Sequence, residues 1–284
     1  MRFFRLKVGS KVTLAVEIEG KYVSVAELLN KQENETDLTD VFAQVSRIKE
    51  ELKKGNYSYL ESKNFGFAPV VGNPGKIICV GLNYLSHIEE TGKKKPEYPV
   101  LFSKYSNSLA GHLDEIKVLG SDLKVDYEGE LGVIIGRPAK DVGSDFEKYI
   151  FGYFIGNDVS SRELQFRTSQ YLLGKTLDGF YPNGPSIVTR DEIEDPQNLW
   201  IKTMVNGSTR QDSNTANMIF SVGKLISYIS RYLTLEAGDV ISTGTPEGVI
   251  LGMEDKEDHW LKPGDTVDVS IQGLGTLKNT FVRA

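Results

Sequence analysis

The first 24 residues alternate between apolar and polar side chains with a period of about two, which is typical of short β-strands. Three such runs, FFRLKV, VTLAVEI and KYVSV, are separated by turn residues at Gly9 and Gly20. Residues 37–54 change to a helical period and form one apolar stripe of Leu38, Val41, Phe42, Val45, Ile48 and Leu52. A Gly- and Pro-rich segment, residues 65–76, follows. We therefore predict a small N-terminal α+β domain over residues 1–70 and a second domain over residues 71–284.

Beyond the linker, short apolar and β-branched runs bounded by turn residues predict a succession of strands. They cover residues 77–80, 98–104, 115–118, 131–135, 151–157, 187–189, 200–205, 240–243, 267–271 and 276–282. One long helix is predicted over residues 218–233, with Asn214 or Thr215 as its N-cap. Many strands and few helices favour a β-rich α+β fold over a doubly wound nucleotide-binding fold.

Composition narrows the class of protein. The 284 residues carry a net charge of −6, which argues against a general nucleic-acid binder. No apolar run approaches the roughly 18 to 20 residues that span a bilayer, and the first 20 residues lack the apolar core of a signal peptide. The single cysteine, Cys79, excludes an internal disulfide and a multi-cysteine metal site. These features predict a soluble, cytoplasmic protein without a membrane partner.

The segment DYEGELGVIIG, residues 126–136, is the first candidate for chemistry. On a strand, Asp126, Glu128 and Glu130 would share one face, with successive side chains about 7 Å apart, while the apolar residues occupy the other face. Hard oxygen ligands of this kind suit Mg²⁺, Mn²⁺ or Ca²⁺. A further acid, Asp158, ends the next clear strand, where a rigid support can hold a ligand. The alternatives are a solvated acidic face for the strand and a helix N-cap for Asp158.

His87 and Glu90 lie three residues apart in a predicted helical turn after a short strand. A carboxylate beside an imidazole fixes its tautomer and raises its basicity, which is how a general base is assembled. The chain has three histidines, so few side chains can fill this role. A surface ion pair without catalytic function is the alternative interpretation.

Two glycine-bounded turns complete the candidate chemistry. The segment GKTLD, with Lys175, lacks the upstream glycine of a phosphate-binding loop, so we interpret its lysine as a partner for an anionic substrate. The segment STGTPEG, residues 242–248, offers hydroxyls and backbone N–H groups to a carboxylate. Ordinary tight-turn chemistry would explain both segments equally well.

Taken in order, CVGLNYLSHIEE, YEGELGVIIG, GYFIGNDVSSRELQ, GKTLDGFYPNGP and LEAGDVISTGTPEGV resemble the fumarylacetoacetate hydrolase superfamily. The resemblance spans roughly residues 70–284 and is closest to bacterial members with a small N-terminal domain, among them oxaloacetate decarboxylases and diketo-acid hydrolases. It implies a catalytic domain built as a mixed β-sandwich or β-roll, and a homodimer.

The same resemblance implies the roles of individual residues. One Mg²⁺ or Mn²⁺ per subunit would be held by Glu128, Glu130 and Asp158. The implied catalytic residues are His87, Glu90 and Lys175, and the implied substrate contacts are Gln165, Thr245, Tyr84, Arg162 and Lys104. After Asp178 this chain continues Gly-Phe-Tyr-Pro, where relatives often have a small residue and then Cys-Pro or Gly-Pro, so these aromatic residues would reshape the pocket.

By this resemblance the chain is a metal-dependent enzyme on a small 2-oxo acid. The first hypothesis is hydrolysis of a C–C bond in a 2,4-dioxo acid, of the acylpyruvate or fumarylpyruvate type, through a metal-stabilised enolate. Oxaloacetate decarboxylation and isomerisation of a 2-hydroxy-dienoate or 2-oxo acid are the alternatives, and a non-catalytic 2-oxo acid binding protein is a minor one. The lysine-rich part of residues 84–98 is interpreted either as a lid over the substrate or as a solvated loop.

Overall fold

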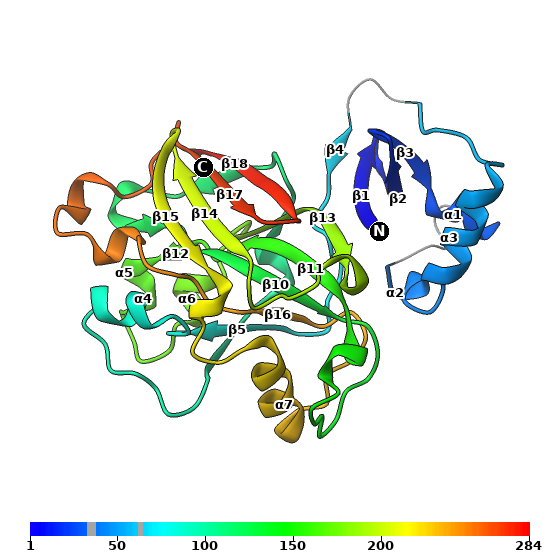
Figure 1. Cartoon of the computed structure of the whole chain (residues 1–284). Coiled ribbons are helices and arrows are strands. Elements are labelled where there is room, and N and C mark those ends of the chain that lie inside the picture. Colours follow the sequence, from blue (N-terminus) through cyan, green and yellow to red (C-terminus); the bar gives the residue numbers. More distant parts are fainter. Residues whose placement is uncertain (33–37, 62–64) are drawn as a thin grey trace.

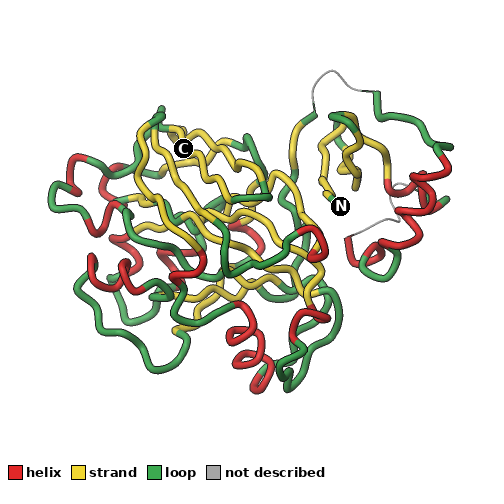
Figure 2. The backbone as a smooth tube through the Cα atoms, viewed as in Figure 1, coloured by secondary structure: helices red, strands yellow, loops and turns green. Residues whose placement is uncertain are grey.

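The computed structural model describes residues 1–32, 38–61 and 65–284. It has the strand-rich α+β fold that the sequence predicts, with two large sheets packed on each other and a smaller N-terminal unit at one side (Figure 1). Short helices and loops gather around the edges of the sheets (Figure 2). Within the described residues, no helix has both the length and the apolar character that a membrane crossing requires.

The larger sheet carries the candidate site near its centre. Its order is β3-β2-β1-β13-β11-β10-β16-β5-β6, and two short strands, β4 and β7, pair with β1 and β13. The strands are β1 (Arg2–Val8), β2 (Lys11–Ile18), β3 (Lys21–Ser24), β4 (Gly66–Phe67), β5 (Ile77–Gly81), β6 (Val100–Lys104), β7 (Leu109–Ala110), β10 (Gly129–Ile135), β11 (Ile150–Asn157), β13 (Tyr181–Thr189) and β16 (Val240–Ser242). Every residue of β10 and β11 is buried, because both faces of the sheet are covered at this point.

The second sheet has the order β15-β14-β17-β18-β8 and packs on β10, β11 and β13. Its strands are β8 (Glu115–Val118), β14 (Trp200–Val205), β15 (Ser208–Asn214), β17 (Thr266–Ile271) and β18 (Gly275–Arg283). A separate two-stranded pair joins β9 (Val125–Asp126) to β12 (Ser160–Ser161). The sequence pattern predicts four of the five strands of the second sheet. It does not predict β15, because the sequence of that strand, STRQDSN, is polar throughout.

Seven α-helices lie in the described part of the chain. They are α1 (Val25–Leu29), α2 (Leu38–Val41), α3 (Val45–Lys54), α4 (Leu85–Glu90), α5 (Arg162–Gln165), α6 (Leu172–Lys175) and α7 (Val222–Tyr232). The single helix predicted over residues 37–54 is two helices, and its first residue, 37, lies outside the described residues. The predicted N-cap of the long helix was wrong: Ser221 caps α7, whereas Asn214 caps a short 3-10 helix of residues 215–217.

The N-terminal unit is connected to the larger sheet by direct strand pairing. Arg2 of β1 lies opposite Val188 of β13, so the N-terminal strands extend the larger sheet. Beneath this junction, Phe3, Ile48 and Phe154 belong to one continuous buried cluster. The division into domains 1–70 and 71–284 stays a prediction.

Candidate active site

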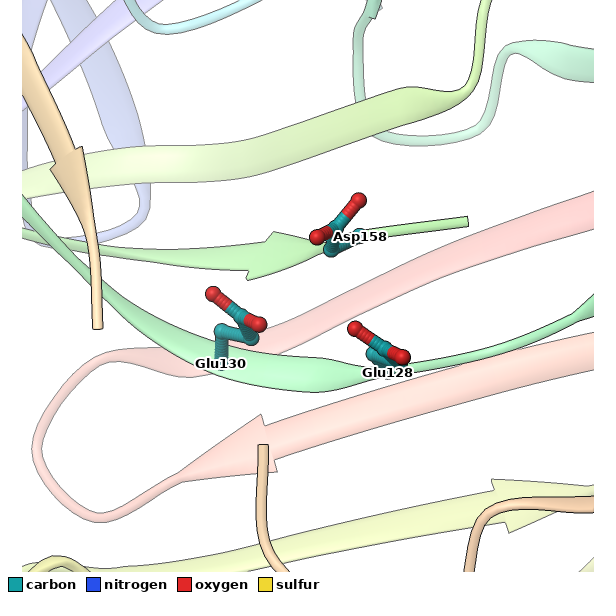
Figure 3. A group of neighbouring side chains, drawn as sticks. All are labelled: Glu128, Glu130 and Asp158. Carbon is teal, nitrogen blue, oxygen red and sulfur yellow. The ribbon is translucent and has the colours of Figure 1, made fainter. Parts of the chain in front are cut away.

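Three carboxylates that are separate in the sequence meet near the centre of the larger sheet. Glu128 directly precedes β10, Glu130 lies in β10, and Asp158 follows the end of the neighbouring antiparallel strand β11. One ligand oxygen of each lies within 4.8 Å of the others, and all three side chains are buried. Figure 3 shows Glu128 and Glu130 projecting from one strand on the side where Asp158 lies.

Backbone contacts fix the spacing of these acids. The Asp158 N–H donates to the carbonyl of Glu128 at 2.8 Å, and the Glu128 N–H donates to Oδ1 of Asn157 at 2.9 Å. Gly129, between the two glutamates, faces the second sheet, where a Cβ would lie 2.4 Å from Oγ1 of Thr203. A larger residue at position 129 would therefore push β10 away from the second sheet and displace both glutamates.

Three buried cations surround the acids. The Lys175 ammonium lies 2.7 Å from Glu128 and 2.9 Å from Asp158, and Lys104 lies 2.6 Å from the other oxygen of Asp158. The Arg162 guanidinium lies 2.7 Å from Glu128. Lys175 reaches this position because α6 packs tightly on α5: a Cβ at Gly174 would lie 2.3 Å from the backbone nitrogen of residue 165.

The surroundings give two of the acids opposite shifts in pKa. Burial alone would raise the pKa of Glu128, but Lys175 and Arg162 outweigh it and lower that pKa to about 2. Burial also raises the pKa of Glu130, and the neighbouring charges of Asp158 and Glu128 raise it further. Glu130 is therefore the acid whose negative charge is least compensated by the protein.

The donor set fits a divalent cation. Counting Asp126 beside the three converging acids, four buried carboxylates face the three cations Lys104, Arg162 and Lys175, which leaves one uncompensated negative charge. The oxygens nearest to one another are all carboxylate oxygens, the ligands that Mg²⁺ and Mn²⁺ prefer. The predicted cation ligands Glu128, Glu130 and Asp158 therefore form a buried acidic triad that could hold a metal.

Asp126 does not join this triad. It lies in β9, which pairs with β12 instead of continuing along β10, and its carboxylate binds Nε and Nη2 of Arg162 at 2.9 and 2.7 Å. The same carboxylate accepts the backbone N–H groups of Ile250 and Leu251. The expectation that Asp126 shares a cation with the two glutamates was wrong, because the chain changes its strand partner between residues 126 and 129.

The predicted His87–Glu90 pair is formed in α4. Nδ1 of His87 lies 2.8 Å from Oε1 of Glu90, and the other oxygen of Glu90 accepts the backbone N–H of Gly248 at 2.8 Å. Gly248 is needed there, because its φ is +95° and a Cβ would lie 2.1 Å from the carbonyl oxygen of Arg210. With Nδ1 engaged, Nε2 is the nitrogen left to exchange a proton with a substrate.

One pocket joins these groups. The residues lining it include, from the candidate catalytic set, His87, Glu128, Glu130, Lys175, Arg162, Gln165 and Thr245. Arg162 is held by Asp126 and Glu128 and also donates to Gln165 at 2.8 Å, while the Thr245 hydroxyl donates to the Gly129 carbonyl. The structure thus brings these seven predicted residues to the same place, with their polar atoms largely committed to one another.

Two predicted substrate contacts lie elsewhere. Tyr84 is fully buried in the core at the start of α4 and does not line the pocket. Lys104 lies behind Asp158, where it also donates to the carbonyls of Val159 and Phe180. The wall of Phe102, Phe166, Tyr171 and Leu251 was not predicted, because isolated aromatic and apolar residues carry no recognisable spacing in the sequence. Lys93, at its edge, belongs to the lysine-rich segment interpreted above as a lid or a solvated loop.

Comparisons with known proteins agree with this geometry. The pattern of the family described as Fumarylacetoacetate (FAA) hydrolase C-terminal matches residues 76–282. A Rattus norvegicus protein named oxaloacetate tautomerase Fahd2a, mitochondrial, is 44% identical over 218 residues, which cover 76% of this chain and 69% of that protein. Among solved structures, the fumarylacetoacetate hydrolase of Exiguobacterium antarcticum is 36% identical with a TM-score of 0.87, and the full length of each chain is covered.

A second solved structure is maleylpyruvate hydrolase from Sphingobium sp. SYK-6, in complex with manganese(II) and pyruvate. It is 25% identical, with a TM-score of 0.83 and full coverage of both chains. The strand-rich fold and the pocket of acids, lysine and histidine define an enzyme. The chain belongs to the fumarylacetoacetate hydrolase superfamily, whose members similar to it are named hydrolases, isomerases and oxaloacetate tautomerases.

Proposed function

We propose that the chain is a divalent-metal-dependent enzyme that acts on oxaloacetate through its enolate and interconverts the keto and enol forms. The observation that carries this proposal is the position of His87, whose Nδ1 is engaged by Glu90, in the same pocket as Glu128, Glu130 and Lys175. Keto–enol interconversion needs a base next to a group that stabilises negative charge on oxygen. The similarity to the rat oxaloacetate tautomerase supports the choice of substrate.

Glu128, Glu130 and Asp158 would hold the ion, with Mg²⁺ or Mn²⁺ as the candidates. When bound, such an ion supplies positive charge to the carboxylate and keto oxygens of a 2-oxo acid. The manganese in the maleylpyruvate hydrolase structure supports this assignment.

The chain's own residues would move the proton. Nε2 of His87 takes a proton from C3 of the keto form, and the electron pair of that C–H bond becomes the C2=C3 double bond while the keto oxygen becomes negative. Glu90 stabilises the resulting imidazolium at 2.8 Å. The Lys175 ammonium offers positive charge to the enolate oxygen. The His87 imidazolium then gives its proton to that oxygen, which completes the enol and restores the neutral imidazole.

Hydrolysis of a C–C bond in a 2,4-dioxo acid is the second candidate. The same pair favours it, because His87 oriented by Glu90 can take a proton from water, which then attacks the distal carbonyl. The similarity to maleylpyruvate hydrolase supports this reaction. Decarboxylation of oxaloacetate is the third candidate, and it needs no attacking water.

A panel of oxaloacetate, acetylpyruvate and fumarylpyruvate, each with Mg²⁺ or Mn²⁺, separates these reactions. Tautomerisation is followed by the decay of the enol absorbance, hydrolysis by release of pyruvate, and decarboxylation by release of CO₂. Enol decay accelerated by the enzyme, without pyruvate or CO₂, supports the first candidate. Absence of turnover with all three compounds and both metals would overturn the whole proposal.

The homodimer also belongs to this proposal. Its support is a row of exposed apolar side chains on and beside β6, which is the end strand of the larger sheet, at Tyr98, Leu101 and Tyr105. Light scattering coupled to size-exclusion chromatography measures the oligomeric state directly. The rat relative is named mitochondrial, so the cytoplasmic location of this chain stays a prediction.

A further inference from the structure

The pocket has an inner end and a mouth. Glu128, Glu130 and Lys175 form the inner end, and the mouth is formed by four residues that also line an adjoining outer hollow: Thr91, Lys93, Phe166 and Leu251. A small substrate whose 2-oxo acid end lies at the acids would therefore direct its other end toward these four side chains.

The backbone of Lys93 is fixed to the helix that carries the base. Helix α4 ends at Glu90 and is followed by Thr91 and Gly92; Gly92 has a φ of +64°, and its N–H donates to the carbonyl of Glu89 at 3.2 Å. The Lys93 N–H donates to the carbonyl of Ile88 at 3.1 Å, which completes a Schellman motif. The chain thus leaves the helix in a defined direction at Lys93, six residues after His87, and the Lys93 side chain lines the same pocket as His87.

Lys93 is also the pocket cation that has no acid partner. Arg162 and Lys175 are both neutralised by buried carboxylates. Across residues 65–284, all of which the structure describes, no carboxylate forms an ion pair with Lys93, and its ammonium lies 5.6 Å from the ring centre of Phe166. An exposed ammonium held over an aromatic ring at a pocket mouth is available to an anionic group of a ligand.

We propose that Lys93 binds the second carboxylate of the substrate and so selects 2-oxo dicarboxylates over 2-oxo monocarboxylates. The inference rests on the proposed function for one end of the substrate only, because it takes the 2-oxo acid group to lie at the acidic triad. Lys93 would bind the carboxylate at the other end of the substrate. It applies equally to oxaloacetate and to fumarylpyruvate, because both carry a distal carboxylate that acetylpyruvate lacks.

The chain offers a matched control. Lys94 is the next residue, is exposed like Lys93, and does not line the pocket. Lys93→Met and Lys94→Met remove the same charge from adjacent positions, so general electrostatic attraction would affect both variants alike. Lys93→Arg keeps the charge and tests whether a cation at position 93 is sufficient.

The kinetic test compares these variants on oxaloacetate, with oxalate as an inhibitor that has no distal carboxylate. We expect Lys93→Met to raise KM for oxaloacetate by about tenfold, the loss expected for one charge-assisted hydrogen bond, with little change in kcat. Lys93→Arg and Lys94→Met should stay near wild type, and inhibition by oxalate should be unchanged in all variants. An equal loss of oxalate inhibition, or an equal effect of Lys94→Met, would overturn the inference.

A binding measurement separates this inference from the reaction itself. Calorimetry on the manganese-loaded protein compares malate, which has a distal carboxylate, with oxalate. Lys93→Met should raise the Kd for malate by about tenfold and leave the Kd for oxalate unchanged. Equal malate binding by wild type and Lys93→Met, including no measurable binding by either, overturns the role of Lys93. Failure of the wild type to turn over any 2-oxo acid instead overturns the proposed function.

Discussion

Lys175 and Glu128 form an ion pair with 2.7 Å between Nζ and Oε2, and both side chains are more than nine-tenths buried. The other oxygen of Glu128 pairs with Arg162, also at 2.7 Å. One carboxylate therefore contacts two buried cations, and loss of its charge leaves each of them with one carboxylate partner, Asp158 for Lys175 and Asp126 for Arg162.

The first prediction concerns this pair. Glu128→Gln should lower the free energy of unfolding by about 1 to 3 kcal/mol, because Lys175 and Arg162 each lose a charged hydrogen-bond partner while keeping the other one, Asp158 and Asp126 respectively. Adding Lys175→Met should recover part of the loss, since it removes a buried ammonium that has lost one of its two carboxylate partners. Urea denaturation measures both effects. Glu163→Gln, an exposed acid paired with Arg167, serves as the control and should change stability by about 0.5 kcal/mol or less. A double variant no more stable than Glu128→Gln would contradict the argument.

The second prediction concerns metal binding. A cation that binds the folded state and not the unfolded state stabilises the fold, by about 2.7 kcal/mol when the cation concentration is one hundred times its Kd. Mn²⁺ should therefore raise the Tm of the wild type in a concentration-dependent manner. Glu130→Gln should abolish the shift, because Glu130 is the triad acid with the least compensated charge. An undiminished shift in Glu130→Gln would place the ion elsewhere, and Glu163→Gln again provides a control that should respond like wild type.

The third prediction concerns the base. His87→Asn should lower turnover by about 10²- to 10⁴-fold, the usual contribution of a general base, while Mn²⁺ affinity stays unchanged because His87 is outside the acidic triad. Glu90→Gln should have a smaller effect in the same direction, since it removes only the partner that orients the ring. His259→Asn is the control, because His259 pairs with Asp255 at the surface. Full activity of His87→Asn in CO₂ release would instead identify a decarboxylase that needs no base.

Much of the site was predictable because it depends on local periodicity. Glu128 and Glu130 share a face by the period of two, and Asp158 ends the next apolar strand; antiparallel pairing of Gly129 with Asn157 then makes them neighbours. His87 and Glu90, three residues apart in the sequence, likewise lie on one turn of α4 and contact each other as the spacing predicts. Sequence patterns suffice where one strand or one helical turn positions the side chains.

The rest depends on tertiary pairing that no local pattern encodes. Asp126 has the same parity as the two glutamates, yet β9 pairs with β12 and delivers its carboxylate to Arg162. Polar β15 is a strand because it pairs along its length with β14, although its own residues have no strand pattern. Tyr84 carries a hydroxyl and lies three residues before His87 in the sequence, but packing buries its side chain in the core. The partner of each segment had to be known before these residues could be placed.

The last prediction concerns pH and the contact between the N-terminal unit and the rest of the chain. Lys49 of α3 donates to Asp191 at 2.6 Å. Burial alone would raise the pKa of Asp191, but hydrogen bonds from Lys49 and Thr189 lower it to about 2, below the value of about 3.9 for an unfolded chain.

Because the pKa of Asp191 is lower in the folded than in the unfolded chain, its ionised carboxylate stabilises the fold fully at a pH above the unfolded-state pKa. This stabilisation is lost as the pH falls from about 4 to about 2. Asp191→Asn should therefore be less stable than wild type at about pH 6, and the difference in Tm should shrink as pH approaches about 2. Lys49→Met should reproduce this convergence, whereas Glu50→Gln, an exposed neighbour on the same helix, should keep a constant offset from wild type. A difference between Asp191→Asn and wild type that persists unchanged at the lowest pH would show that the two residues stabilise the fold by packing and not by charge.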